Sequence, residues 1–258
     1  AMPVRRIGVD RTAGRHIRLP GNEVTCLAVD SLGRLWVGTA TNGIGILAGE
    51  GWTYLDNTNS PIATEGVKHI HHDHRGWVWI STELGLYCHT GEEWRHYDNT
   101  PESHGGFTFF GPNVRAVDVR EDGLVAVATM NAGLTYLTET EFVYYTAASS
   151  NFPDNSMNDV VFDENGDRWL ACPSGGLIWH AASFIGGPWF QYDSFTAGLP
   201  NKTMLCVVID DAVVTPSYVT EFTPDRELPI IKAIALGSLR NKLLILLPAA
   251  LVLSQFLP

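Results

Sequence analysis

Short runs of β-branched, aliphatic and aromatic residues alternate with clusters of Gly, Asn and Asp through most of this chain. Such runs predict β-strands joined by tight turns. The same order of runs and turns recurs in four segments that begin at Val24, Val67, Val114 and Met157. A fifth segment begins at Met204 and then loses the pattern. The periodicity therefore predicts an all-β protein made of repeats and excludes a helical solenoid.

The repeats stay in register residue by residue. A turn glycine recurs at Gly33, Gly76, Gly123 and Gly166. Three positions earlier, the repeats have Asp30, Asp73, Arg120, Asp163 and, in the fifth segment, Asp210, at intervals of 43, 47, 43 and 47 residues. Three positions after the turn glycine, they have Trp36, Trp79, Ala126 and Trp169. The third repeat therefore departs from the pattern at both the acidic and the tryptophan position.

Each repeat has the length and strand content of one propeller blade. Four antiparallel strands in roughly 40–45 residues make a blade, and one blade cannot bury both of its faces alone. We expect the recurring tryptophans and aliphatic residues to fill the interfaces between blades. The sequence thus predicts a β-propeller with four full four-stranded blades over residues 1–222.

One phrase of the repeat resembles a known family. Residues 30–39 read DSLGRLWVGT, residues 73–82 read DHRGWVWIST, and residues 163–172 read DENGDRWLAC. This D-x-x-G-x-x-W-x-G-T pattern resembles the two-component regulator propeller repeat, and the resemblance covers roughly residues 22–210. It implies an extracytoplasmic sensor portion or a surface protein, for which a glycan fragment can be the signal. The third repeat, REDGLVAVAT, lacks the tryptophan.

The number of blades is open between two alternatives. Residues 204–210 and 212–222 can supply two strands of a fifth blade, and residues 6–11 and 15–19 can supply the others. A blade split in this way between the termini closes a five-bladed ring. Sensors of the resembled family are usually seven-bladed, so the alternative is an open fragment of a larger propeller.

Residues 223–258 form an apolar tail that we expect to be separate from the propeller and that can be helical. Its longest uncharged run, Leu243–Leu253, has eleven residues, short of the roughly 20 that span a bilayer as a helix. Membrane association through this tail is therefore a disfavoured alternative. No segment near the N-terminus has the apolar core of a signal peptide.

Charge limits the partners. The chain has 17 Lys and Arg against 28 Asp and Glu, a formal net charge of -11, and no basic cluster of the kind that binds nucleic acid. The four cysteines form no C-x-x-C pair, so no zinc ribbon or redox motif is present. We expect no nucleic-acid partner and no cofactor.

The repeat register places one set of residues around the predicted channel. Equivalent positions on the innermost strands are held by Cys26, His69, Ala116, Asp159 and Cys206. We favour ordinary packing around a wet channel over a ligand or metal site, because these groups form no recognised metal geometry.

The segment HIHHDH, residues 69–74, contains a weak metal candidate formed by His69, His71 and Asp73. Imidazole and carboxylate are good zinc ligands. However, Asp73 is also the turn residue of the repeat, so a metallohydrolase is disfavoured and no metal is expected.

Aromatic residues that vary between the repeats are candidates for stacking on sugar rings. They are Trp77, Trp179, Tyr144, Tyr192 and Phe109, and the last of these lies in the inserted loop 99–113. No nucleophilic triad, phosphate loop or dinucleotide fingerprint is present. We therefore expect a non-enzymatic propeller that recognises a glycan or a protein. A propeller enzyme such as a lyase or a glycan-cleaving enzyme is one alternative, and a scaffold or truncated propeller without activity of its own is another.

Overall fold

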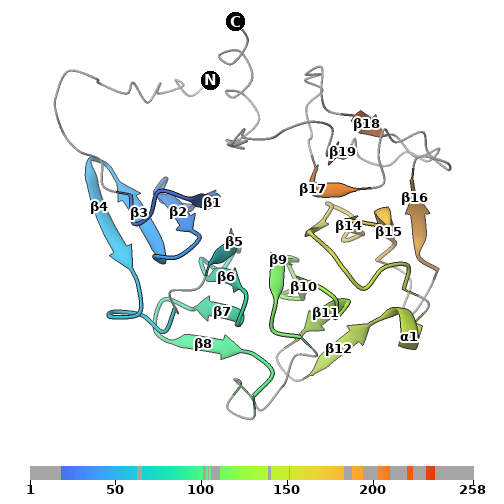
Figure 1. The fold of residues 1–258 in the computed structure, drawn as a ribbon, viewed down its shortest axis with the longest axis horizontal. Coiled ribbons are helices and arrows are strands. Elements are labelled where there is room, and N and C mark those ends of the chain that lie inside the picture. The colour runs from blue at the N-terminus through green and yellow to red at the C-terminus, as the bar shows by residue number, and fades with distance from the viewer. Residues whose placement is uncertain are drawn as a thin grey trace, which may run out of the picture.

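The structure is a computed structural model. The residues that it describes are 19–62, 66–100, 103, 105, 111–138, 141–150, 152–182, 188–193, 203–209, 220–222 and 231–235. Over these residues the protein consists of five antiparallel sheets arranged around a common centre (Figure 1). This is the fold of a β-propeller, as the sequence predicted, and each sheet is a blade.

Four blades have four strands each, paired in chain order from the innermost to the outermost strand. Blade 1 comprises β1 (Val24–Val29), β2 (Leu35–Thr39), β3 (Ile44–Ala48) and β4 (Gly51–Leu55). Blade 2 comprises β5 (Val67–His72), β6 (Val78–Thr82), β7 (Gly85–His89) and β8 (Trp94–Tyr97). Blade 3 comprises β9 (Val114–Val119), β10 (Val125–Thr129), β11 (Leu134–Leu137) and β12 (Phe142–Tyr145). Blade 4 comprises β13 (Asp159–Phe162), β14 (Arg168–Cys172), β15 (Gly176–His180) and β16 (Phe190–Tyr192), and the short helix α1 (Ala147–Ser150) precedes it.

The fifth sheet differs from the predicted fifth blade. Its strands are β17 (Met204–Ile209), β18 (Thr220–Phe222) and β19 (Ile231–Ala235), in the order β17-β19-β18. The predicted inner strand is present as β17. The two strands predicted within 204–210 and 212–222 are present in this sheet as β17 and β18. They are not neighbours, because each of them pairs with β19.

The strand β19 also lies in the segment that we expected to be a separate tail. Residues 231–235 are a strand there and not a helix, and the predicted boundary at residue 222 falls between two strands of one sheet. The rest of the tail lies outside the described residues, and so do the N-terminal strands predicted at 6–11 and 15–19, apart from Leu19. The closure of the ring therefore stays a prediction.

The hydrophobic core is divided among the seams between blades. One buried cluster joins blade 3 to blade 4 through Ala126, Tyr136, Leu170 and Ile178, among others. Similar clusters fill the seams between blades 1 and 2, 2 and 3, and 4 and 5. Burying apolar area contributes about 25 cal/mol per Å², so each blade depends on its neighbours for most of its stability.

The recurring Asp and Trp are bonded to each other within each blade that has both. In blade 4 the Trp169 Nε1 donates to Asp163 Oδ2 at 3.0 Å, and Asp163 Oδ1 accepts from the backbone N of Asn165 and Asp167. Blades 1 and 2 repeat the Trp-to-Asp bond at 3.0 Å. One carboxylate therefore fixes both the tight turn and the buried indole, which explains their common spacing. Blade 3 lacks this pair, because the corresponding residues are Arg120 and Ala126.

Candidate functional site

Side chains bridge the innermost strands of neighbouring blades. Among the described strands, β1, β5, β9, β13 and β17 belong to separate sheets, although successive members of this series contact one another. The bridges run from a side chain of one blade to the backbone of the next. They are Thr25 Oγ1 to Val67 O, Val117 N to His69 Nδ1 (3.4 Å), Phe162 N to Asp118 Oδ2 (2.6 Å), Val207 N to Asp159 Oδ2 (3.1 Å) and Asn158 Nδ2 to Met204 O (2.7 Å).

Asp118 is the junction of these bridges and was missed by the sequence analysis. Its Oδ2 accepts from Phe162 N of blade 4, and its Oδ1 lies 3.4 Å from His71 Nδ1 of blade 2. One carboxylate of blade 3 thus contacts both neighbouring blades. The available signal was that a carboxylate occupies an inner-strand position held by Ala28, Val161 and Val208 in other repeats.

Four of the predicted channel residues, Cys26, His69, Asp159 and Cys206, lie on the innermost strands, where each is half-buried. Burial raises the pKa of Asp159 to about 7 and lowers the pKa of His69 to about 3. Burial likewise raises the pKa of Cys26 and Cys206 to about 12. A thiol with so high a pKa is not a nucleophile near neutral pH. Neutral forms of all four groups are therefore favoured over much of the range between acid and neutral pH.

These shifts predict opposing pH dependences that single substitutions separate. Unfolding releases the proton of Asp159 between about pH 4 and pH 7, so this group makes the free energy of unfolding fall as pH rises. Unfolding lets His69 take up a proton between about pH 3 and pH 6.5, so this group makes the same free energy rise with pH. We expect the free energy of unfolding of Asp159→Asn to rise with pH, because only the contribution of His69 remains. We expect that of His69→Asn to fall with pH, because only the contribution of Asp159 remains.

Urea unfolding of both variants at a series of pH values measures these slopes, which can reach about 1.4 kcal/mol per pH unit for one proton. The wild-type chain is the control and should show a shallower dependence than either variant. Slopes of the same sign in both variants would contradict the assignment.

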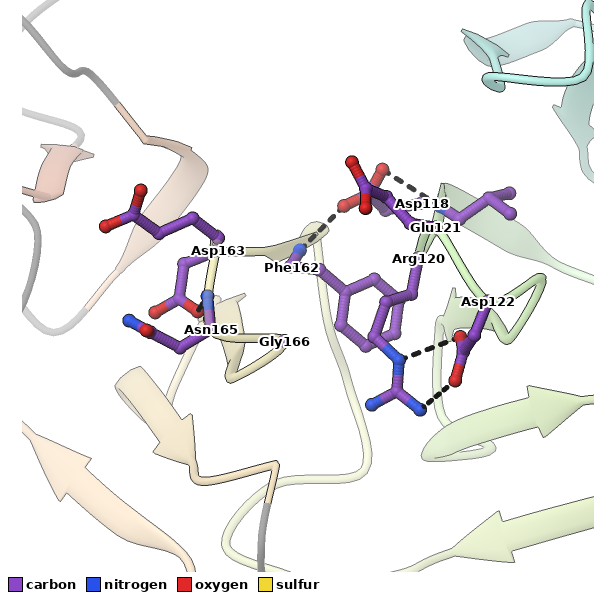
Figure 2. Close-up of a pocket in the computed structure, with 10 residues that line it drawn as sticks. Asp118, Arg120, Glu121, Asp122, Phe162, Asp163, Asn165 and Gly166 are labelled. Carbon is purple, nitrogen blue, oxygen red and sulfur yellow. Dashed lines mark hydrogen bonds and ion pairs between the residues drawn. The ribbon is translucent and has the colours of Figure 1, made fainter.

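A cavity of about 520 Å³ lies between blades 3 and 4, at the end of the inner strands where the tight turns are (Figure 2). It is lined by two segments, residues 118–122 and 162–166. These contribute five carboxylates, those of Asp118, Glu121, Asp122, Asp163 and Glu164. The cavity is therefore acidic.

Arg120 is the cation of this cavity lining, and it is paired. Its Nε and Nη2 donate to the two carboxylate oxygens of Asp122 at 2.9 and 2.7 Å, and this pairing lowers the pKa of Asp122 to about 2. The guanidinium also lies 5.7 Å from the centroid of the Phe162 ring, and Figure 2 shows the two side chains next to each other. Asp163 is held by Trp169 and Asp122 by Arg120, so Glu121 and Glu164 are the exposed carboxylates of the cavity outside these two pairs.

The departure of blade 3 from the repeat lies in the lining of this cavity. In blades 1 and 2 the carboxylate of the turn aspartate accepts a hydrogen bond from the indole of its own blade. An arginine of the same turn, Arg34 in blade 1 and Arg75 in blade 2, pairs with that carboxylate. In blade 3 Arg120 replaces the carboxylate and turns to Asp122. The signal was present in the sequence as the joint loss of Asp and Trp, but the sequence did not indicate a cavity.

The aromatic residues predicted to stack on sugars are not brought together. Trp179 is 6% exposed, its Nε1 donates to Asp167 Oδ2 at 3.1 Å, and its ring packs on Trp169 and Phe190. Trp179 is therefore a buried side chain in this structure, and its role in sugar binding stays a prediction. The guanidinium carbons of Arg75 and Arg95 lie 3.9 and 4.8 Å from the centroid of the Trp77 ring.

The other predicted aromatic residues are spread over two blades. Tyr144 on β12 contacts Phe142, and Tyr192 on β16 stacks on Trp169. Phe109 lies outside the described residues. A sugar platform that joins these residues stays a prediction.

The weak metal candidate is also divided. His69 and His71 lie on β5, but the Asp73 Oδ2 is held by Trp79 Nε1 and by the guanidinium of Arg75. Its carboxylate is thus committed to the turn. Within the described part of the chain, no group of three or more His, Cys, Asp or Glu is arranged to hold a metal ion.

Two family models match parts of the chain. Residues 18–41 match the two-component regulator propeller, in agreement with the resemblance found in the first repeat. Residues 194–258 match a family described as a protein of unknown function, DUF808. A search of curated proteins found no match.

Solved structures with this fold include sensors and an enzyme. The extracellular domain assigned to a hybrid two-component system of B. thetaiotaomicron has a TM-score of 0.63 and 22% identity, covering 75% of this chain and 26% of that one. The extracellular domain assigned to a one-component system of the same organism has a TM-score of 0.58 and 16% identity, with coverages of 84% and 28%. Virginiamycin B lyase from Staphylococcus aureus has a TM-score of 0.54 and 14% identity, with coverages of 71% and 59%.

These likenesses establish the β-propeller fold. The chain spans about a quarter of the length of the two sensor domains. Among the described residues, no helix is both long enough and apolar enough to cross a membrane.

Proposed function

We propose that this chain is a ligand-binding portion of an extracytoplasmic sensor or surface propeller, that it is not an enzyme, and that its ligand is a glycan. The family match in the first repeat and the fold of the two sensor domains support the class. The observation on which the glycan proposal rests is the cavity between blades 3 and 4. Glu121 and Glu164 are exposed there, and Asn165 adds an exposed amide. Carboxylate and amide oxygens accept hydrogen bonds from sugar hydroxyls.

The proposal predicts that each exposed glutamate contributes to binding. In Glu121→Gln and Glu164→Gln, an acceptor with a full charge becomes a neutral one, and a hydrogen bond to a charged group contributes about 1.5–3 kcal/mol. We expect the affinity for a bound neutral oligosaccharide to fall about tenfold in each variant. Isothermal titration of the full chain with a panel of neutral oligosaccharides measures this effect.

Glu92→Gln is the matched control, because Glu92 is an exposed glutamate in the β7–β8 turn of blade 2. The Glu92→Gln variant should bind the oligosaccharide with the same affinity as the wild type. An equal loss in all three variants would contradict a site in the cavity, and binding of no oligosaccharide in the panel would contradict glycan recognition.

A propeller enzyme is the second candidate, favoured by one observation. Asp159 lies on an innermost strand with its pKa raised to about 7 by burial, which suits a general acid or base near neutral pH. Product analysis of the same oligosaccharide mixtures distinguishes the two candidates. Cleavage or elimination by the wild-type chain that is lost in Asp159→Asn would favour the enzyme over the non-enzymatic binding protein.

A further inference from the structure

A second feature lies at the opposite end of the inner strands. The pairing register shifts near the start of β1, β5, β9 and β17, so that one residue of each is left out of the ladder. The bulged residues are Thr25, Lys68, Arg115 and Leu205. A bulge bends its strand and redirects a side chain. Inner strands of six residues separate this end from the tight turns by roughly 20 Å.

Two of the bulged residues are cations on neighbouring strands. Lys68 on β5 and Arg115 on β9 both act on Glu83, which follows β6. The Lys68 Nζ lies 2.6 Å from Glu83 Oε1, and this bond, with a smaller effect of Arg115, lowers the pKa of Glu83. Lys68 is therefore the ion-pair partner of Glu83, whereas Arg115 acts on that carboxylate only at longer range and has no ion pair among the described residues.

Among the described residues, Arg115 has a poor set of acceptors. Its Nη2 contacts the sulfur of Met130 at 3.4 Å, and its buried Nε has no hydrogen-bond partner within this part of the chain. A thioether is a weak acceptor, whereas a guanidinium offers five donors in a fork that matches an oxyanion. Met130 is 40% exposed. An anion that displaced the thioether would thus give Arg115 the acceptor it lacks.

We propose that Arg115 and Lys68 form a binding site for the carboxylate group of an anionic ligand, at the end of the inner strands opposite the acidic cavity. The one guanidinium without an ion pair among the described residues matches one carboxylate rather than a doubly charged phosphate. The site is separate from the cavity of the proposed function, so its test does not depend on the binding results for the Glu121 and Glu164 variants.

Titration of the full chain with glucuronate, glucose and glucose 6-phosphate at low ionic strength tests the proposal. We expect binding of glucuronate and none of glucose. Arg115→Gln should weaken glucuronate binding about tenfold or more, since a charge-assisted hydrogen bond contributes about 1.5–3 kcal/mol. Arg95→Gln is the matched control, because Arg95 pairs with Glu93 on the outermost strand of blade 2, and it should leave the affinity unchanged.

Glu83→Gln provides a test with the opposite sign. Glu83 is half exposed, so its replacement should leave the fold intact while removing the carboxylate that competes with the ligand. We expect glucuronate to bind several-fold more tightly to this variant. Equal binding of glucose, unchanged affinity in Arg115→Gln, or weaker binding in Glu83→Gln would overturn the proposal. Tighter binding of glucose 6-phosphate than of glucuronate would overturn the assignment to a carboxylate.

Discussion

Replacement of Gly133 by alanine is expected to lower the free energy of unfolding by about 3 kcal/mol or more. Gly133 has a φ of 81°, and a Cβ placed on it would lie 2.1 Å from the carbonyl oxygen of Tyr145. The oxygen belongs to the backbone of β12, so it cannot move aside without shifting the closing strand of blade 3. The variant thus combines the conformational cost of a positive φ with a steric clash.

Gly33→Ala separates these two contributions. Gly33 has a similar φ of 74°, but a Cβ there would meet nothing within 4 Å. We expect this variant to lose only the conformational part, about 1–2 kcal/mol. Urea unfolding of both variants measures the difference. Equal losses would mean that β12 yields to the added methyl group and that the close approach has no energetic weight.

Gly33 belongs to the series of turn glycines, and Gly133 belongs to a second recurring series with Gly43, Gly85 and Gly176, but only the structure distinguishes the roles of the two series. Both recur in every full repeat, and repetition alone gives them equal importance. The difference depends on the distance from Gly133 to a strand that follows it in the chain. This distance depends on how the last strand of the blade folds back against the strand before it, and the hydrophobic pattern of the sequence does not predict that distance.

The blades themselves were predictable because each is a local structure. Hairpins joined by short turns specify their own pairing, and four copies in register confirm one another. The fifth sheet was not predictable, since β17 pairs with β19 across more than twenty intervening residues. In that segment the repeat pattern ends, so the strand order had no local signal.

The candidate site was predictable only in part, for a related reason. The repeat register identified His69 and Asp159 as equivalent inner-strand residues. It could not identify their partners, because Val117 N and Val207 N belong to the next blade. Variation between repeats does not indicate whether an aromatic side chain is exposed, and the indole of Trp179 is buried with its Nε1 bonded to Asp167.

Trp169→Ala is the second substitution with a large expected effect. Trp169 is fully buried in the seam between blade 4 and the fifth sheet, and loss of a buried tryptophan side chain costs about 3–5 kcal/mol. Trp169→Phe retains much of the packing but removes the Nε1 donor to Asp163. The expected loss is then about 1–3 kcal/mol, because a buried carboxylate oxygen loses its partner.

A double-mutant cycle tests whether the two residues act as a unit. We expect Asp163→Ala combined with Trp169→Phe to cost less than the sum of the single substitutions, with a coupling of about 1–2 kcal/mol. The control cycle combines Trp169→Phe with Asp73→Asn, whose carboxylate serves Trp79 in blade 2, and these should add within about 0.5 kcal/mol. Blade 3 supports the coupling, since Arg120 and Ala126 have replaced both members and the blade still forms. Additive costs at Asp163 and Trp169 would mean that the joint loss in blade 3 has another cause.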